Sequence, residues 1–581
     1  MFGKKKKKNN EAEKKRIVIL GGGFGGVYTA KHLQKLFRYQ RDKYEIVLVN
    51  RENYFTYQPM LAEVVGGSLG ILDSVSALRN LLKHTTIFVR EISEINIENK
   101  EIVLSPNFNH TDINLKYDYL VVGLGTVTDF RNSPGGLHEH ALRFKNLADA
   151  FKLRNRLIDV IETASTEKDP EMKKQLLTFV VGGGGFSGIE VVAEINDFTR
   201  SLAKNYESLD PKDIRVVLIH SKDRLVEREL SVSLGRYAAK LLKKRGVEII
   251  FNEHLVSATP YEAILEKGER IPSRTIISTV PASPNPLLET LPFDMEKGHI
   301  ITNSTLQVLH TDNVWAIGDC AAVPSPTGVG YCPPTAQFAV RQGKCVAHNI
   351  HATCTGKKKK IFHFKALGMM AALGHRRAVA EIFGTIKLSG WIAWIFWRMI
   401  YLMKLPGFNR KVKVGLSWIM ETIIPQEAAQ LKPDVRSGMT HLHYAKDETI
   451  FRKGDVGDYL YIISSGKVEV VEERFGMDVQ VAVLGKGEFF GEMALLRQKK
   501  RNATVRCLED CELIAIRKND FNILVTNFGD LKKDFIRAEK KRLKKGKEII
   551  DSHGNIEYIG DVLHHPDHPE EEIKYPRAKN E

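Results

Sequence analysis

Two glycine-rich loops of the same type stand out in this sequence, and each directly follows a short β-branched strand. The first has the form G-x-G-x-x-G at residues 21–26, after a strand at 16–20, and the second repeats it at 183–188, after a strand at 179–182. In such a loop the first glycine makes a tight turn, the second lets a pyrophosphate approach the backbone, and the third lets the next helix pack closely. Apolar residues with helical spacing follow each loop, so each opens a helix whose N-terminus favours phosphate. The sequence therefore predicts two Rossmann-like domains for two dinucleotides.

Length, charge and cysteine content limit the number of domains, the kind of partner and the cellular compartment. A chain of 581 residues is too long for one hydrophobic core, so several domains are expected. The formal net charge is +16, with basic runs at 4–8, 357–360, 499–501 and 540–547, which favours an anionic partner such as a membrane surface rather than nucleic acid. The six cysteines include no C-x-x-C pair, which indicates a reducing compartment and no metal site. The basic N-terminus lacks the apolar run of a signal peptide.

The most apolar segment, residues 388–403, carries three tryptophans at helical spacing. It is interrupted by Arg398 and is shorter than the ~18 to 20 apolar residues that a membrane span requires. Trp391, Trp394 and Trp397 are expected to share one side of a helix, beside basic residues at 398, 404, 410, 411 and 413. This pattern is typical of a helix lying in the membrane interface, and a buried core or dimer helix is the alternative.

Two further strand–turn segments complete the pattern of a flavoprotein. Residues 117–126 are predicted to form a strand ending in a glycine turn that includes Gly125, and residues 313–321 a strand ending at Gly318 and Asp319. Asp319 is expected to accept a ribityl hydroxyl of FAD and to open a helix that faces the flavin. The chain thus resembles the flavoproteins with two dinucleotide-binding domains, which implies FAD at the first loop and NADH or NADPH at the second.

Over residues 15–430 the resemblance narrows to the type II NADH:quinone oxidoreductases. It is carried by Y-Q-P-M-L at 57–61, G-I-E-V at 188–191, P-P-T-A-Q-F-A-V-R-Q-G at 333–343 and G-M-M-A at 368–371. No cysteine precedes Cys320, so disulfide reductases and sulfide:quinone oxidoreductases do not fit. The resemblance implies a non-proton-pumping respiratory-chain enzyme, peripheral on the cytoplasmic face of the plasma (inner) membrane and often a homodimer.

The resemblance also assigns roles to individual residues. Glu190 is expected near the nicotinamide and the quinone as a proton relay, and a carboxylate that only stabilises the helix N-terminus is the alternative. Gln337 is expected at the flavin edge or a quinone carbonyl, unless it is simply a polar residue starting a buried helix. Arg341 replaces the family's glutamine in the wall of the quinone pocket. The expected FAD site comprises Gly21, Gly23, Phe24, Gly25, Gly26, Asn50, Arg51, Gly125, Gly318, Asp319 and Ala336, and the NAD(P)H site Gly183, Gly185, Gly188, Glu190, His220 and Lys222.

Both acidic residues expected at the nucleotide riboses are replaced in this chain. Asn50 can still hydrogen-bond a ribose without carrying charge, so we expect FAD binding to survive. His220 stands where the family often has glutamate, so a 2′-phosphate is no longer repelled, and Lys222 or Arg224 would attract it. Both NADH and NADPH therefore remain open as substrates.

From about residue 442 the pattern changes to short β-runs separated by glycines, which predicts an antiparallel roll. Residues 487–496 and 501–504 resemble the phosphate-binding cassette of cyclic nucleotide-binding domains. Gly491 is expected to open a helix toward the phosphate, Glu492 to accept the ribose 2′-OH and Arg501 to pair the cyclic phosphate, with Met493 and Asn502 beside them. Asn502 does not distinguish cyclic AMP from cyclic GMP, and a roll that has lost its ligand is the alternative.

The sequence thus predicts an α/β protein with two Rossmann-like dinucleotide-binding domains, a membrane-interface helical region and an antiparallel β-roll cyclic nucleotide-binding domain. The function predicted is an FAD-dependent NAD(P)H:quinone oxidoreductase regulated by a cyclic nucleotide. A slow redox sensor that responds to the cyclic nucleotide and a soluble NAD(P)H:acceptor reductase remain alternatives. The expected segments are a basic tail at 1–15, an FAD domain at 16–150 and 300–360, an NAD(P)H domain at 151–299, a membrane-associating region at 361–430, the roll at 431–545 and a flexible tail at 546–581.

Overall fold

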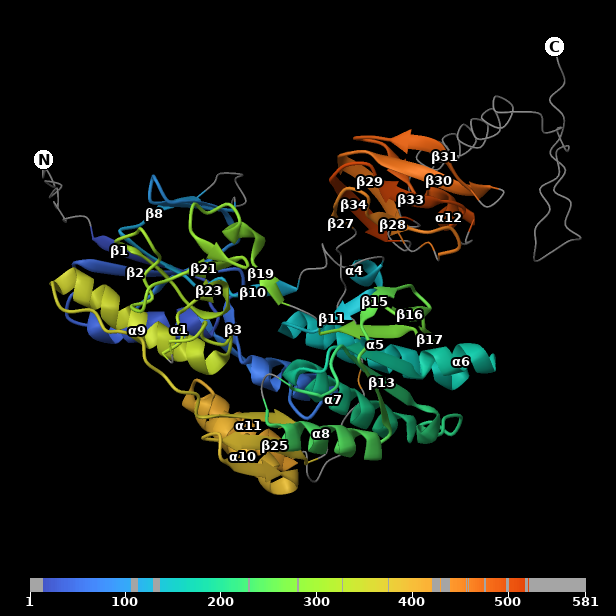
Figure 1. The fold of residues 1–581 in the computed structure, drawn as a ribbon, viewed down its shortest axis with the longest axis horizontal. Coiled ribbons are helices and arrows are strands. Elements are labelled where there is room, and N and C mark those ends of the chain that lie inside the picture. The colour runs from blue at the N-terminus through green and yellow to red at the C-terminus, as the bar shows by residue number, and fades with distance from the viewer. Residues whose placement is uncertain are drawn as a thin grey trace, which may run out of the picture. The chain divides into compact units, whose positions relative to one another are not determined.

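The computed structural model forms two compact units, residues 1–432 and 433–581, and each is described by itself (Figure 1). The residues that it describes are 14–105, 113–128, 136–227, 230–279, 282–326, 328–374, 376–420, 429, 439–455, 457, 459–474, 477–497, 501–517 and 521. The expected basic tail before residue 14, the part of the expected roll after Phe521 and the expected flexible tail at 546–581 lie outside these residues.

The first sheet of the larger unit has five parallel strands in the order β22-β9-β1-β2-β5. They are β1 (Lys15–Leu20), β2 (Tyr44–Asn50), β5 (Thr86–Val89), β9 (Tyr119–Val122) and β22 (Val314–Ala316). The central strand β1 is apolar on both faces and buried from residue 17 to 20, as a parallel sheet covered on both sides requires. Helices α1 (Phe24–Leu36) and α9 (Ala336–Thr355) lie side by side against it, because Gly343 of α9 lets the backbone of Gly25 approach closely.

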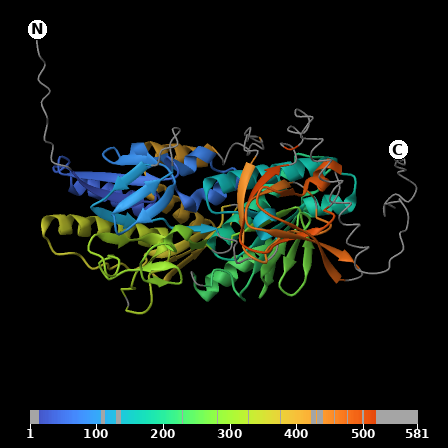
Figure 2. The ribbon, with the colours of Figure 1, turned by 90° about the horizontal axis from the view of Figure 1, so that it is seen from above.

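The second sheet is also parallel, in the order β11-β18-β12-β13-β14. Its strands are β11 (Ala141–Arg143), β12 (Thr178–Gly182), β13 (Arg215–His220), β14 (Val247–Phe251) and β18 (Thr275–Ser278). Figure 2 shows the blue strands of the first domain and the teal and green elements of the second as separate groups. One boundary differs from the prediction, since β11 pairs with β18 in the second sheet although the first domain was expected to run to residue 150. Only after β11 does a new helix begin, capped by Asn146.

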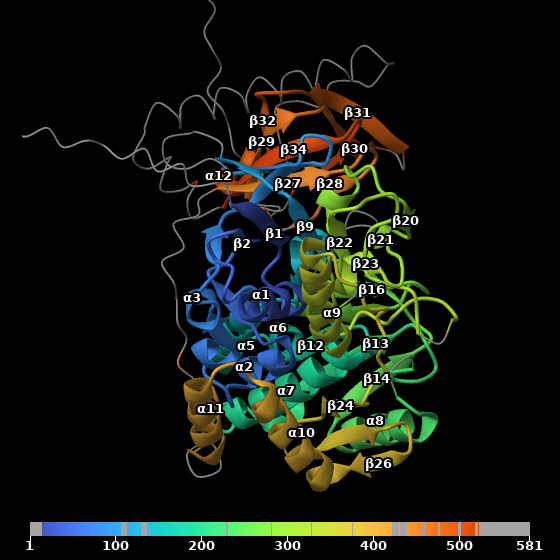
Figure 3. The ribbon, with the colours of Figure 1, turned by 90° about the vertical axis from the view of Figure 1, so that its left-hand side faces the viewer.

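After α9 the chain forms a small antiparallel sheet followed by two helices, shown at one end of the unit in Figure 3. The elements are β24 (Gly368–Ala372), β25 (Ala378–Ile382), β26 (Ile386–Ser389), α10 (Gly390–Lys404) and α11 (Phe408–Met420). We call α10 and α11 the C-terminal hairpin. Among the described residues, no helix has both the length and the apolar content to cross a membrane.

The tryptophans of α10 do not share one exposed side. Trp391 is 58% exposed, whereas Trp397 is 1% exposed and packs against Trp418 of α11. The prediction for Trp397 was therefore wrong: helical spacing placed it with Trp391, but six residues are far enough along a helix to turn it toward the core. The outward apolar side chains of the hairpin are instead Trp391, Ile392, Ile395, Phe396, Met399, Met403, Phe408, Val412, Leu416, Ile419 and Met420.

The smaller unit is built on two four-stranded antiparallel sheets, ordered β27-β34-β29-β32 and β28-β33-β30-β31. Its strands are β27 (Met439–Tyr444), β28 (Thr449–Phe451), β29 (Tyr459–Ser465), β30 (Val468–Arg474), β31 (Met477–Leu484), β32 (Phe489–Phe490), β33 (Thr504–Cys507) and β34 (Cys511–Arg517). Their buried faces form the main apolar core, and Leu460, Leu495, Ile516 and Phe521 form a second, smaller cluster. A short helix, α12 (Glu492–Arg497), follows β32. This is the β-roll that the glycine-punctuated sequence predicts.

Candidate active site and nucleotide sites

The first glycine loop has the geometry of a dinucleotide cradle. Gly21 has φ +100°, a conformation that side chains disfavour, and an added Cβ there would overlap the Gly123 carbonyl. A Cβ on Gly26 would overlap the Gly21 carbonyl, whereas one on Gly23 would meet nothing within 4 Å. The open space therefore lies above the second glycine, where a pyrophosphate has to approach. FAD fits this loop, because the close contacts at Gly21 and Gly26 set the shape of the loop and the space above Gly23 leaves room for a pyrophosphate.

Asn50 closes the first loop from the end of β2. Its Oδ1 accepts a hydrogen bond from Gly22 N at 2.7 Å, and its Nδ2 donates to Glu52 O at 2.7 Å. The Asn50 amide thus accepts a hydrogen bond from the backbone of the loop, as the carboxylate of an acid at this position would. Its neighbour Arg51 is largely exposed and lies within ion-pair distance of Glu52 and Glu91.

The second loop repeats the first closely. Gly183 has φ +108°, and a Cβ on Gly188 would overlap the Gly183 carbonyl. His220, at the end of β13, takes the place of Asn50: its Nδ1 accepts from Gly184 N at 3.1 Å. Its Nε2 lies 2.9 Å from Arg224 O, so it is the protonated nitrogen that donates there. Burial lowers the pKa of His220, which keeps the ring neutral in this role.

Beyond His220 the two cations predicted to attract a 2′-phosphate differ in their surroundings. Arg224 donates from Nη1 to Leu230 O and from Nη2 to Glu227 O, both at 2.8 Å, so its guanidinium is held within the loop. Lys222 is exposed. The structure thus favours Lys222 over Arg224 as the cation that meets a phosphate.

A cavity of about 810 Å³ joins the two nucleotide loops to the C-terminal hairpin. It brings together five residues that the sequence singled out, from helices α1, α7 (Phe186–Ala203) and α9: Phe24, Glu190, Ala336, Gln337 and Arg341. It is also lined by residues at the end of α10 and the start of α11, among them Met403, Lys404 and Phe408. The cavity therefore connects the expected flavin position with an exposed apolar surface.

Glu190 lies in the second turn of α7 and lines this cavity. Its Oε1 accepts a hydrogen bond from Ala372 N of β24 at 3.2 Å. Burial raises the pKa of Glu190 to about 8; the Ala372 N–H opposes the rise and the carboxylate of Glu63 adds to it. Glu190 therefore holds a proton at neutral pH, which suits a proton donor.

Gln337 and Arg341 line the cavity from α9, but both are engaged by the protein. Gln337 Nε2 donates to Gly368 O at 2.7 Å, and its Oε1 accepts from Leu367 N at 3.3 Å. Its amide thus ties α9 to the start of β24. Arg341 donates from Nη1 to Gln337 O at 3.0 Å, and its guanidinium lies 4.0 Å from the ring centre of Phe364. The cation in the cavity wall is therefore fixed against an aromatic ring.

The segment at Asp319 differs from the prediction. No long helix opens there: Gly318–Cys320 is a single 3₁₀ turn, and the helix that reaches the cavity is α9, which begins at Ala336. Gly318 has φ +71°, and its N–H donates to Gln342 Oε1 at 2.8 Å, so α9 holds this turn. Burial raises the pKa of Asp319, while Lys145 and His299 oppose the rise. Gly125 has φ +65° and open space at its Cβ position.

Sequence reasoning missed several residues of the site. Gln342 is buried on α9, Tyr401 of α10 lines the cavity, and Glu63 on α2 (Leu61–Gly66) acts on Glu190. Gln342 lies within the motif at 333–343 but was given no role there, whereas Tyr401 and Glu63 belong to no motif; the proximity of these residues depends on how distant segments pack. All six cysteines are free, and Cys320 is buried beside the 3₁₀ turn.

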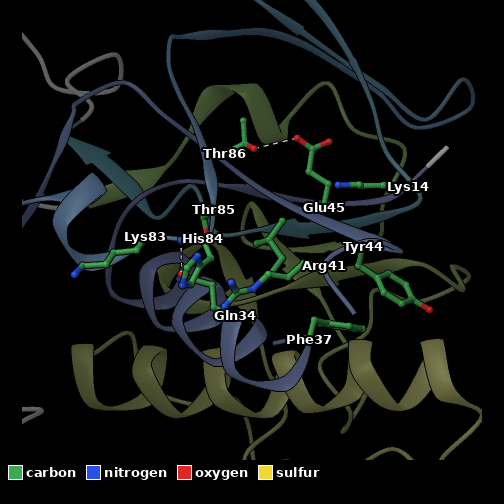
Figure 4. A pocket seen from close by; sticks show the side chains of 11 residues that line it. Lys14, Gln34, Phe37, Arg41, Tyr44, Glu45, Lys83, His84, Thr85 and Thr86 are labelled. Carbon is green, nitrogen blue, oxygen red and sulfur yellow. Dashed lines mark hydrogen bonds between the residues drawn. The ribbon is translucent and has the colours of Figure 1, made fainter. Parts of the chain in front are cut away.

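A second, smaller cavity of about 370 Å³ lies at the amino ends of the strands of the first sheet (Figure 4). It is lined by residues that precede β1 or begin β2 and β5, including Lys14, Tyr44 and Thr86. Glu45 accepts a hydrogen bond from Thr86 Oγ1 at 3.0 Å, and the Lys83 side chain points away from the other labelled groups. Dinucleotides bind at the carboxyl ends of parallel strands, so this cavity is not the flavin site.

In the smaller unit the predicted cassette residues come together. Arg501 is 4% exposed; its Nη1 donates to Gly491 O at 2.8 Å and its Nη2 to Tyr459 O at 2.7 Å. Its guanidinium lies 4.1 Å from the ring centre of Phe451. Gly491 has φ +86°, a backbone conformation that favours glycine, and a Cβ there would displace the guanidinium of Arg501. Glu492 is buried at the start of α12, Met493 is half-buried, and Asn502 is exposed.

Three family descriptions match successive parts of the chain. "Pyridine nucleotide-disulphide oxidoreductase" matches residues 15–343, "NDH2 C-terminal domain" residues 367–425 and "Cyclic nucleotide-binding domain" residues 441–528. The second match covers the small sheet and the C-terminal hairpin, and the third covers the β-roll.

Curated proteins and solved structures agree with these matches. Demethylphylloquinone reductase NdbB of Synechocystis is 31% identical over 68% of this chain and 94% of its own length. Type II NADH:quinone oxidoreductase Ndh of Mycobacterium tuberculosis is 29% identical over 70% of this chain and 88% of its own length. The structure of NDH2 from Plasmodium falciparum in complex with NADH superposes with a TM-score of 0.66 and 19% identity, over 72% of this chain and 100% of that one.

Proposed function

Because this chain belongs to the pyridine nucleotide-disulphide oxidoreductase family, as a type II NADH:quinone oxidoreductase joined to a cyclic nucleotide-binding domain, we propose that it oxidises NADH or NADPH with a quinone at a membrane surface. The observation that carries the proposal is the cavity of about 810 Å³. It runs from Phe24 beside the first loop and Glu190 beside the second to the apolar residues Met403 and Phe408. A lipid quinone needs such a path, because it must leave the bilayer without entering water.

Anaerobic flavin reduction tests this function most directly. We expect the purified chain to carry non-covalent FAD, which NADH or NADPH bleaches and a short-chain quinone then re-oxidises. A folded, colourless protein would contradict the enzymatic role. Bleaching without re-oxidation by quinone would instead favour a slow redox sensor.

The residues of the cavity have separate tasks in this reaction. FAD, when bound, accepts hydride from the nicotinamide and passes two electrons on to the second substrate. Glu190 holds a proton beside the cavity at neutral pH and is positioned to deliver it to a quinone oxygen. Gln337 keeps α9 and β24 together, and Arg341 places a fixed positive charge in the wall, where it favours a substrate that becomes anionic on reduction.

We expect NADPH to be used within about tenfold of NADH, a difference of roughly 1.4 kcal/mol. His220 carries no negative charge to repel a 2′-phosphate, and Lys222 is exposed beside it. The variant His220→Glu should restore a strong preference for NADH, and Lys222→Ala should weaken NADPH use alone. Steady-state kcat/KM for both nucleotides measures these effects. A wild-type preference for NADH of a thousandfold would show that His220 is not the selector.

We place the enzyme peripherally on the cytoplasmic face of the plasma (inner) membrane. The support is the set of exposed apolar residues on the C-terminal hairpin. The same hairpin lines the cavity and carries basic residues such as Lys404 and Lys411. Exposed apolar surface next to basic side chains suits an anionic bilayer interface. A homodimer joined through the same region is a further part of the proposal.

Replacing outward residues of the hairpin should release the protein from membranes. The triple variant Trp391→Ser, Phe396→Ser and Met399→Ser removes three exposed side chains, and we expect it to stay in solution with its FAD bound. Sedimentation with anionic vesicles, with and without salt, measures the change. Trp397→Ala is the matched control, because this buried residue should lower stability without being part of the membrane face. Unchanged sedimentation of the triple variant would contradict the interfacial role.

Regulation by a cyclic nucleotide is the last part of the proposed function. It is supported by the burial of Arg501 and Glu492 in the cassette and by Gly491, whose φ of +86° favours glycine beside the guanidinium. The effector, cyclic AMP or cyclic GMP, has to bind one state of the enzyme more tightly than another in order to change its rate. The direction of that change is read from NADH oxidation with and without each nucleotide.

A further inference from the structure

One buried carboxylate outside the nucleotide sites, Glu63 on α2, is held by both helices of the C-terminal hairpin. Trp418 Nε1 of α11 donates to Glu63 Oε2 at 3.0 Å. Arg398 Nη2 of α10 lies 3.8 Å from Glu63 Oε1, and its guanidinium lies 4.1 Å from the ring centre of Trp394 and 4.7 Å from that of Trp418. Glu63 is therefore one point at which both helices of the hairpin are attached to the rest of the unit.

The same carboxylate acts electrostatically on Glu190, which lies on the neighbouring helix α7. Helix α2 packs directly against α7, since a Cβ on Gly66 would overlap the side chain of Glu194, one turn after Glu190. The negative charge of Glu63 adds to the rise in the pKa of Glu190 that burial causes. The region from β24 to α11 thus contacts both carboxylates. Ala372 N of β24 donates to Glu190, Trp418 donates to Glu63, and Arg398 lies within ion-pair distance of Glu63.

The other elements around the cavity contribute aromatic hydroxyls and cations. Tyr401 of α10 stands near Glu190, and burial together with the Glu190 charge raises the pKa of Tyr401. Burial, with Tyr401 and Tyr28 adding, also raises the pKa of Tyr57. The titratable and charged side chains that line the cavity with Glu190 are Tyr28, Lys31, Tyr57, Arg341, Lys344, Tyr401, Lys404 and Lys411. Glu63 is the charged neighbour that makes the proton harder to release.

We propose that Glu63 is a positioning residue that couples the seating of the C-terminal hairpin to protonation of Glu190. Two neighbouring carboxylates divide their protons according to which one is better stabilised as an anion. While the hairpin is seated, Arg398 and Trp418 stabilise the charge on Glu63, and Glu190 keeps the proton. When the hairpin moves away, Glu63 loses these partners and takes up a proton more readily, so Glu190 gives up its own at a lower pH. The inference rests on the proton-relay role proposed for Glu190.

The test is the pH dependence of quinone reduction by the FAD-loaded full chain. If Glu190 delivers the proton, the wild-type rate should fall as pH rises through about 8, where that carboxyl ionises. Glu63→Gln keeps an acceptor for Trp418 but removes the charge, so we expect the midpoint to fall by about one pH unit with flavin content unchanged. Trp418→Phe keeps the ring but removes the donor, and it should shift the midpoint in the same direction. If Glu63→Gln does not retain FAD, Trp418→Phe is the variant whose midpoint is measured instead.

Asp73 provides a matched control for loosening of the hairpin. It is also buried, and it pairs with Arg410 Nη1 at 3.1 Å and with Lys413 Nζ at 2.9 Å, both from α11. Asp73→Asn should therefore loosen the same hairpin and, through the coupling, lower the midpoint in the same direction. In the double variant Asp73→Asn with Glu63→Gln no further fall beyond that of Glu63→Gln is expected, because the Glu63 charge is already absent; a further fall would overturn the specific role of the Glu63 charge.

Glu190→Gln separates failure of the inference from failure of the relay. If this variant keeps the wild-type pH transition, Glu190 is not the relay and the proposed function loses that step. If Glu190→Gln abolishes the transition while Glu63→Gln and Trp418→Phe leave its midpoint unmoved, the coupling alone is wrong.

Discussion

Arg501→Ala is expected to weaken cyclic nucleotide binding by about 30-fold to several thousand-fold, which corresponds to a loss of about 2 to 5 kcal/mol for a buried charge pair. The guanidinium sits 4% exposed between the carbonyls of Gly491 and Tyr459, and no water competes strongly for it there. Calorimetric titration of the full chain with cyclic AMP and with cyclic GMP measures the change. FAD content should stay the same, because the roll is a separate compact unit.

Two further variants distinguish ligand contact from loss of structure. Arg501→Ala also removes the donor to two half-buried carbonyls, those of Gly491 and Tyr459, so it should lower the stability of the roll. Arg501→Lys keeps the charge and loses the planar fork, and we expect an intermediate affinity. Any effect of the nucleotide on NADH oxidation has to disappear in Arg501→Ala. If wild-type protein binds neither nucleotide at millimolar concentration, the roll is a structural domain without an effector.

Gly26→Ala and Gly23→Ala should both lose FAD, but for different reasons. A Cβ on Gly26 overlaps the Gly21 carbonyl, so α1 has to move away from β1, at a cost of about 1 to 3 kcal/mol in the free energy of unfolding. A Cβ on Gly23 meets no protein atom within 4 Å and, at φ −78°, causes no backbone strain. The FAD-free Gly23→Ala protein should therefore unfold within about 0.5 kcal/mol of wild type.

Denaturant unfolding of the FAD-free proteins, together with FAD titration, separates the two effects. Gly23→Ala should bind FAD at least about tenfold more weakly, because the methyl group fills the space left for the pyrophosphate. Equal destabilisation by both substitutions would mean that the space above Gly23 is closed in solution. Normal FAD affinity in Gly23→Ala would mean that the pyrophosphate lies elsewhere.

The two glycine loops were predictable because their chemistry is local. Each needs a strand, three glycines and a helix within about 30 residues, and the structure has both sets with matching close contacts. The β-roll was predictable for a similar reason, since glycines and alternating runs define its hairpins. Comparison with known families confirms both assignments.

The sequence did not reveal what depends on tertiary packing. Spacing alone placed Trp397 beside Trp391, but only the contact with Trp418 shows which side of α10 is buried. Asp319 was expected to open a helix, yet the segment there is a single 3₁₀ turn, and its Gly318 N–H donates to Gln342. Glu63 has no motif of its own, and its partners Arg398 and Trp418 lie more than 330 residues further along the chain.

The different acceptors that close the two loops imply different tolerance of acid. Asn50 does not titrate, so the bond from Gly22 persists at any pH at which the domain is folded. His220 accepts the Gly184 N–H only when neutral; its pKa is lowered from the usual 6.5, so the bond is intact above that pH and breaks as the pH falls through the lowered value. Mild acid should then disable the second loop while the first stays intact. The protein would remain yellow and yet no longer be reduced by NADH.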